Sequence, residues 1–163
     1  MLITTTVSSP IGTLRLYAEL DRLVGLYLPD RPAPDGVERR SRVLREASVQ
    51  LTEYFAGRRR AFSLELALHG TGFQRCVWDA LAQIPYGETR SYAELARAIG
   101  RPAAPRAVGA ANGRNPISII VPCHRLIGTD GSLTGYGGGL AAKRWLLEHE
   151  RAGTPRARPE DGC

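Results

Sequence analysis

The chain has 163 residues, enough to bury a hydrophobic core in one domain or in two small ones. Its formal net charge of +6 suits an anionic partner, although 21 arginines against one lysine indicate a compositional bias that does not identify this partner. The absence of any apolar run near ~18 residues, of a charged signal-peptide start and of a cysteine framework excludes a membrane or disulfide-stapled secreted protein, so we predict a cytoplasmic one.

Residues 1–70 are predicted to form a small domain of sheet and helix. Three short β-prone runs separated by turn sequences predict an antiparallel meander, over residues 2–7, 14–18 and 23–28. Residues 30–40 are rich in proline, aspartate and arginine, which predicts a loop.

A helix and a further strand are expected to complete this domain. From Ser41 onward, apolar residues recur at helical spacing, at Val43, Ala47, Leu51 and Phe55. Apolar residues then alternate with the period of a half-buried strand, at Phe62, Leu64, Leu66 and Leu68. We expect the domain to end near His69-Gly70.

Residues 71–150 are predicted to form a second, mostly helical domain. Thr71 and Gln74 match a capping box at the start of its first helix. Residues 151–163 contain no large apolar side chain, which predicts a disordered tail. The expected fold class is therefore α/β (α+β), with an antiparallel sheet and helix followed by a helical domain.

A helix-turn-helix is predicted within this second domain. Ser91 and Glu94 match a second capping box, and Gly100 is a stop signal for the helix that they begin. Another helix is expected from Pro105 to about Arg114, unusually rich in alanine and glycine. Two short helices joined by a tight turn are typical of DNA-binding proteins.

The region from residue 95 to residue 129 carries positive charge alone. It contains no acidic residue and five arginines, Arg97, Arg101, Arg106, Arg114 and Arg125. A solvated arginine-rich face would give the same composition. The helix-turn-helix context favours contacts with DNA phosphates.

The motif Pro122-Cys123-His124-Arg125 follows an apolar run, residues 117–121, that predicts a buried strand. Pro122 cannot donate a ladder hydrogen bond, so the strand should stop there and hold the thiol at its end. His124 and Arg125 are expected to lower the pKa of Cys123 and favour the thiolate. A small buried hydrophobic role is the alternative for this cysteine.

An ordered series of motifs from Phe73 to Glu150, about half of the chain, resembles the O6-alkylguanine-DNA alkyltransferases. The matching segments are Phe73-Gln74, Val77-Trp78, Ile84-Pro85-Tyr86-Gly87-Glu88-Thr89, Ser91-Tyr92, Arg106-Ala107-Val108-Gly109-Ala110, Asn115-Pro116, Ile119-Ile120-Val121-Pro122-Cys123-His124-Arg125, Leu133-Thr134-Gly135-Tyr136, Gly138-Gly139 and Lys143 through Leu147 to Glu150. The resemblance implies single-turnover repair, in which an alkyl group moves from O6-alkylguanine, and from O4-alkylthymine, to Cys123.

The resemblance also implies roles for the other catalytic residues. His124 would act as general base through a bound water, and Glu150 would orient its ring. Asn115 would hold the turn that leads to Cys123. Tyr92 would aid extrusion of the damaged base and hydrogen-bond it, while Arg106 would fill the gap that the base leaves in the duplex.

Substrate-binding residues, partners and cofactors follow from the same resemblance. The base pocket is expected to comprise Tyr92, Cys123, Leu126, Tyr136, Gly137 and Gly138. The expected partner is double-stranded DNA containing O6-alkylguanine, bound by a monomer that could cluster on DNA, with no membrane and no cofactor. Residues 1–70 hold no cysteine and one histidine, His69, so we predict no zinc site. Cys76 is expected to have a packing role, and the sequence leaves open whether it faces inward or outward.

Three other functions fit this sequence less well. Alkyltransferase-like proteins bind lesions without transfer, but they carry another residue, typically tryptophan, where this chain has Cys123. A transcription factor would leave the motif of residues 122–125 unexplained. A cysteine hydrolase normally has its base far from the nucleophile in sequence.

Overall fold

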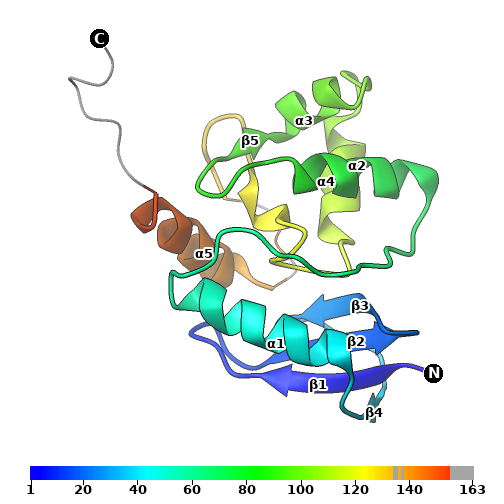
Figure 1. The fold of residues 1–163 in the computed structure, drawn as a ribbon. Helices are drawn as coiled ribbons and strands as arrows, with labels where there is room; N and C mark the ends of the chain where they lie inside the picture. Colours follow the sequence, from blue (N-terminus) through cyan, green and yellow to red (C-terminus); the bar gives the residue numbers. More distant parts are fainter. Residues whose placement is uncertain (134–135, 137, 155–163) are drawn as a thin grey trace.

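A four-stranded sheet covered by one helix forms the amino-terminal part of the computed structural model, which describes residues 1–133, 136 and 138–154. Strands β1 (Ile3–Val7), β2 (Leu14–Glu19) and β3 (Arg22–Tyr27) form the predicted antiparallel meander (Figure 1). The short β4 (Val37–Glu38) lies within the predicted loop and pairs parallel with β1. The strand order is β3-β2-β1-β4.

Helix α1 (Arg42–Phe55) packs across this sheet. The Ser41 hydroxyl caps its first turn by accepting a hydrogen bond from the Leu44 amide at 3.2 Å. Val43, Ala47 and Leu51 are buried, as their helical spacing predicts.

The prediction of a strand at residues 62–68 is wrong, because the structure has no regular strand there. This segment pairs with the sheet only through a bridge between Leu23 and Leu66, where the Leu23 amide donates to the Glu65 carbonyl at 2.9 Å. Its leucines are half-buried, while Ser63 and Glu65 are exposed. The alternation arises because the segment passes between the sheet and the helical part, and it does not reflect a hydrogen-bonded ladder.

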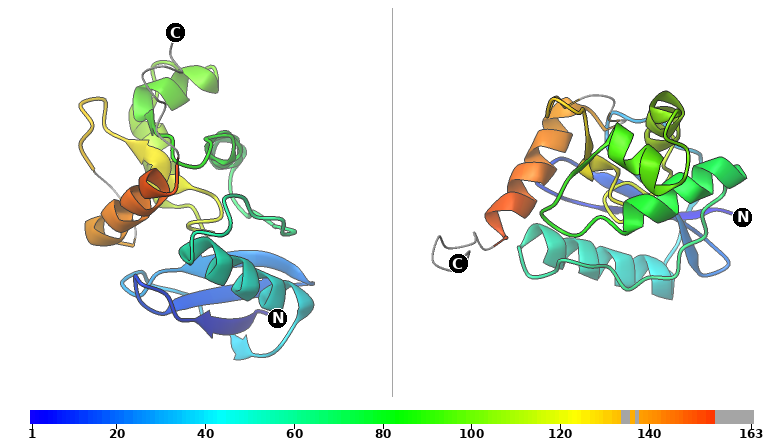
Figure 2. Two further views of the ribbon diagram at one scale, coloured as in Figure 1. Left: turned by 60° about the vertical axis from the view of Figure 1, so that its left-hand side comes forward. Right: turned by 90° about the horizontal axis from the view of Figure 1, so that it is seen from above.

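Helices make up most of the carboxyl-terminal part. Its green helices lie on the other side of this segment from α1, whereas its last helix, in orange and red, reaches the end of α1 (Figure 2). The helices of this part are α2 (Gly72–Ala82), α3 (Tyr92–Ala98), α4 (Pro105–Gly113) and α5 (Leu140–Ala152). Both predicted capping boxes are present, at the starts of α2 and α3. The short strands β5 (Arg90–Ser91) and β6 (Leu126–Ile127) pair in parallel. The predicted mixed α/β class is confirmed, whereas the exact domain boundaries stay a prediction.

The expected strand at residues 117–121 is also wrong, because these residues form a tight turn. Ile117 makes one bridge to Leu26 of β3, and the Val121 amide donates back to the Ile117 carbonyl at 3.0 Å. Ile119 has a φ of +72°, a conformation that β-branched residues rarely adopt. The run is apolar because the turn is buried, and it delivers the chain to a 3₁₀ turn, η1 (Cys123–Arg125).

The end of the described chain is more ordered than the sequence predicts. Arg151 and Ala152 belong to α5, so the predicted disorder from residue 151 is wrong for these two positions. Gly153 and Thr154 follow the helix and are also held, since the Thr154 hydroxyl donates to the Glu150 carbonyl at 2.8 Å and Arg60 donates to the Gly153 carbonyl. The rest of the predicted tail, residues 155–163, lies outside the described residues. Across the residues that the structure describes, no helix combines the length and the apolar character needed to cross a membrane.

Candidate active site

Cys123 opens η1 and is 3% exposed. Asn115 holds the turn before it: the side-chain amide donates to the Val121 carbonyl at 2.8 Å, and the side-chain oxygen accepts from the Ile117 amide at 3.0 Å. Asn112 of α4 donates to the Cys123 carbonyl at 3.4 Å. The position of the thiol is therefore fixed by side chains that bind the backbone on both sides of it.

Glu150 of α5 is the centre of a buried hydrogen-bond network. Its carboxylate lies 2.7 Å from His124 Nε2 and accepts from the Tyr54 hydroxyl at 2.6 Å. It also accepts from Arg125 Nε at 2.8 Å and from the Gly87 amide at 3.3 Å. Burial alone would raise the pKa of Glu150, but the hydrogen bonds from His124 and Arg125 and the charge of Arg125 outweigh it and hold the pKa well below its usual range.

Arg125 corrects one expectation from the sequence. It was predicted to contact DNA phosphates, but it is 6% exposed and its guanidinium binds the Glu150 carboxylate and, at 2.6 Å, the Ile84 carbonyl. Because this buried cation is paired with a carboxylate, it holds the site together and is not free to bind a phosphate. Arg125 is not a DNA contact in this structure.

The His124 ring is completely buried, with Nε2 bound to Glu150. Burial lowers the pKa of His124, and Glu150 only partly opposes this effect. The neutral ring is thus favoured, with its proton on Nε2 directed to the carboxylate. Nδ1 has no hydrogen-bond partner among the described residues and is left as the basic nitrogen.

The electrostatic surroundings of Cys123 also differ from the prediction. Burial raises the pKa of the thiol in this structure, whereas the sequence led us to expect a lowered one. The opposing influences are hydrogen bonds from Asn115 and Ser118 and the charges of Arg31 and Lys143. The adjacent Arg125 has its charge neutralised by Glu150, so it is not the cation that favours the thiolate.

Three residues of this site were missed by sequence reasoning. Lys143 is fully buried and donates to the Leu126 carbonyl at 2.6 Å. The sequence did offer one indication of its role: it is the one lysine among 22 lysines and arginines, which indicates that arginine cannot replace lysine at this position. Tyr54 looked like an ordinary core residue of α1, and Arg31 lies in a segment with no regular pattern.

The predicted substrate residues surround Cys123 only in part. Leu126 and Tyr136 are buried, and burial together with the neighbouring Cys123 raises the pKa of Tyr136. Gly138 is required by packing, since a Cβ there would lie 2.4 Å from the Leu28 side chain. Gly137 lies outside the described residues.

Tyr92 begins α3, where it is half-buried, and its ring lies against α4. A Cβ at Gly109 would be 3.5 Å from this ring, which is ordinary van der Waals contact, so the ring packs directly against this turn of α4. The four remaining predicted DNA contacts are exposed on the helix-turn-helix and its flanks, and they are Arg97, Arg101, Arg106 and Arg114.

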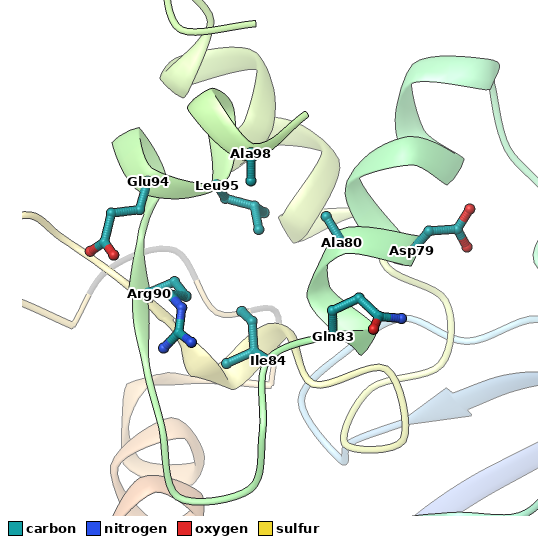
Figure 3. Close-up of a pocket in the computed structure, with 8 residues that line it drawn as sticks. All are labelled: Asp79, Ala80, Gln83, Ile84, Arg90, Glu94, Leu95 and Ala98. Atoms are coloured by element: carbon teal, nitrogen blue, oxygen red, sulfur yellow. The ribbon is translucent and has the colours of Figure 1, made fainter. Parts of the chain in front are cut away.

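A hollow of about 580 Å³ lies between α2 and α3, and none of the predicted site residues lines it (Figure 3). Its lining consists of Asp79, Ala80, Gln83, Ile84, Arg90, Glu94, Leu95 and Ala98. The hollow is lined by both polar and apolar side chains. Because no predicted site residue lines it, it is distinct from the site around the thiol.

The fold and the site together define a class: a helix-turn-helix protein that carries a buried cysteine beside a histidine–glutamate pair. The model of the family described as 6-O-methylguanine DNA methyltransferase, DNA binding domain, matches residues 72–152, and the model of its ribonuclease-like domain matches residues 2–68. The chain belongs to the 6-O-methylguanine DNA methyltransferase family.

Relatives and solved structures agree with this assignment over nearly the whole chain. A methylated-DNA–protein-cysteine methyltransferase of Mycolicibacterium paratuberculosis is 53% identical, covering 92% of this chain and 93% of its own. The constitutive one of Bacillus subtilis is 48% identical, covering 90% and 94%. The crystal structure of Mycobacterium tuberculosis OGT in complex with DNA has a TM-score of 0.88 at 50% identity, covering 94% and 95%.

Proposed function

We propose that this protein repairs DNA by accepting the alkyl group of O6-alkylguanine on Cys123, in a single turnover. The observation that carries this proposal is the buried Cys123 at the start of η1, followed directly by His124 with its ring bound to Glu150. Membership of a family described by methyl transfer from 6-O-methylguanine in DNA supports it. The relatives' name, which specifies a protein cysteine as acceptor, supports it further.

The transfer step is a displacement at the alkyl carbon. The thiol proton passes through a water to His124 Nδ1, and Glu150 stabilises the ring that becomes charged. The Cys123 sulfur then forms a bond to the alkyl carbon as the bond from that carbon to guanine O6 breaks. The departing guanine takes the electron pair, and a proton or hydrogen bond from the Tyr92 hydroxyl makes it a better leaving group.

Access to the alkyl group requires the guanine to leave the base stack. Arg106 and Gly109 are three residues apart on α4, so they share the face against which the Tyr92 ring lies. This placement suits Arg106 for the space vacated in the duplex and Tyr92 for the extruded base. The small residues of α4 suit close approach to a minor groove.

The remaining exposed arginines fit phosphate contacts that carry no sequence information. Arg97, Arg101 and Arg114 are exposed on the helix-turn-helix or at its ends, where they can reach phosphates. The protein would then find lesions rather than a particular sequence. We infer a cytoplasmic monomer, able to cluster on DNA and to accept alkyl groups from O4-alkylthymine as well.

The proposal is tested by separating binding from transfer. Cys123→Ala should bind a duplex containing O6-methylguanine with the parental affinity, measured by fluorescence anisotropy, and should release no methyl group from it. Cys76→Ala is the matched control, because Cys76 is an exposed cysteine on α2, contrary to the packing role predicted for it. Retained transfer in Cys123→Ala, or its loss in Cys76→Ala, would overturn the assignment of the acceptor.

A further inference from the structure

Arg31 follows β3 in the amino-terminal part and reaches across to the turn that precedes Cys123. Its Nη1 donates to the Asn115 carbonyl at 2.5 Å and lies 3.4 Å from the Ser118 hydroxyl. These two partners belong to the carboxyl-terminal part, more than 80 residues later in the chain. The contact therefore joins the sheet domain to the active-site turn.

The guanidinium of Arg31 is itself held in place. Its central carbon lies 5.1 Å from the centroid of the Tyr27 ring, a cation–π arrangement. The Arg31 carbonyl accepts a hydrogen bond from Arg15 of β2 at 2.7 Å. Contacts to both the side chain and the backbone leave little freedom for this group, so its charge is preorganised.

The two residues that Arg31 binds, Asn115 and Ser118, also act on Cys123 through their side chains. Asn115 and Ser118 each contribute a hydrogen bond that lowers the pKa of Cys123, and the charge of Arg31 lowers it further. Lys143 of α5 supplies a second cation near the thiol, and Tyr136 is the other titratable group beside it. His124 follows Cys123 directly, with its ring bound to Glu150. Burial opposes the thiolate and raises the pKa of Cys123 overall, and these cations offset that effect in part.

We propose that Arg31 is a positioning residue for the transfer reaction, fixing the Asn115–Ser118 turn and placing a positive charge beside the sulfur as the thiolate forms. This inference rests on the proposed function and gives the amino-terminal domain a part in it. Arg31 touches neither the alkyl group nor the base. A lysine at this position would keep the charge but lose the planar group that binds two acceptors and covers Tyr27.

The test measures alkyl transfer from free O6-benzylguanine as a function of pH in the full-length protein, so that DNA binding does not enter. Arg31→Met removes a cation near the thiol, which raises the pKa of Cys123. The rate at pH 7 should fall on the order of tenfold, as for a shift of about one pKa unit, and should recover as the pH rises. The transfer rate of Arg31→Lys at pH 7 should lie between those of the parent protein and Arg31→Met. Arg45→Met is the control, since Arg45 is an exposed arginine of α1 outside this network.

Each outcome decides the inference. An unshifted pH profile in Arg31→Met would overturn it, as would an equal loss of rate at every pH, which would indicate a structural role alone. If Arg31→Met does not fold, as judged by its melting temperature, Arg31→Gln, which also removes the charge but keeps a polar side chain, decides in the same way. Failure of the parent protein to transfer benzyl to Cys123 would contradict the proposed function itself, before any variant is compared.

Discussion

At the scale of single residues, Glu150 is the most constrained group of the site. Its carboxylate serves both His124, the proposed base, and Arg125, a buried cation. Removing a carboxylate from such a network leaves an uncompensated charge, which costs about 3–5 kcal/mol. Stability and transfer rate are therefore linked at this position, and a single substitution cannot separate them.

The prediction for this network uses a pair of variants. Glu150→Gln should lower both the melting temperature and the transfer rate, the rate by on the order of 10²-fold, because His124 loses its orienting partner. Adding Arg125→Met removes the unpaired cation and should restore most of the stability without restoring the rate. Higher pH should partly rescue the rate, since hydroxide then deprotonates the thiol. Parental transfer by the double variant would contradict the orienting role of Glu150.

At the scale of secondary-structure elements, the helix-turn-helix presents arginines with different expected roles. Arg106 lies in the first turn of α4, on the face with Tyr92, whereas Arg97 lies in the last turn of α3. Both are exposed, so neither is needed for packing. Their substitutions form a matched pair that separates insertion into the duplex from attraction to its phosphates.

We expect Arg106→Ala to slow repair of duplex DNA far more than transfer from free O6-benzylguanine, which needs no base extrusion. Arg97→Gln should weaken DNA binding modestly and reduce the slope of its salt dependence by about one unit. The measurement is the ratio of duplex to free-base rates in each variant. Equal losses on both substrates for Arg106→Ala would show that this residue supports the pocket or the fold.

Sequence reasoning was most accurate for the helices and least accurate for buried irregular segments. The capping boxes at Thr71 and Ser91 are local signals, and the helices begin where they predict. Residues 62–68 and 117–121 carry strand-like apolar patterns, but they are buried by packing between the two parts of the chain. Apolar periodicity reports burial, and it cannot show whether a neighbouring strand is available for pairing.

The same limit applies to the site. The motif around Cys123 and the resemblance around Glu150 pointed to residues that the structure brings into one region, with His124 and Glu150 in direct contact. The partners from the amino-terminal part, Arg31 and Tyr54, had no such signal, because their roles depend on how distant segments meet. Arg125 was misassigned for the same reason, since charge patterning does not distinguish a buried cation from an exposed one.

At the scale of the whole molecule, the amino-terminal part contacts the site residues of the carboxyl-terminal part directly. Tyr54 of α1 is fully buried and donates to Glu150 of α5 at 2.6 Å. His149 lies beside the same ring and contacts the Tyr54 carbonyl at 2.8 Å. The end of α1 therefore anchors α5, the helix that positions the carboxylate.

Tyr54→Phe tests this coupling, because it removes one hydroxyl and keeps the ring. Glu150 retains its bonds to His124 and Arg125, so we expect a loss of about 1–3 kcal/mol in unfolding free energy and a smaller loss of rate than in Glu150→Gln. Chemical denaturation and the benzyl-transfer assay measure the two effects. Phe62→Leu provides a control, because it changes a ring packed against Tyr54 but removes no hydrogen bond from the network. An unchanged stability in Tyr54→Phe would mean that the hydroxyl does not anchor α5.

The central claim is that Cys123 accepts one alkyl group and does not release it, since a thioether is a poor leaving group. Intact-mass spectrometry after incubation with excess duplex containing O6-methylguanine tests this most directly. We predict the addition of a single methyl group per molecule, mapping to Cys123, with no further transfer as more substrate is supplied. Turnover beyond one equivalent, or a methyl group on Cys76 or Cys163, would contradict the account.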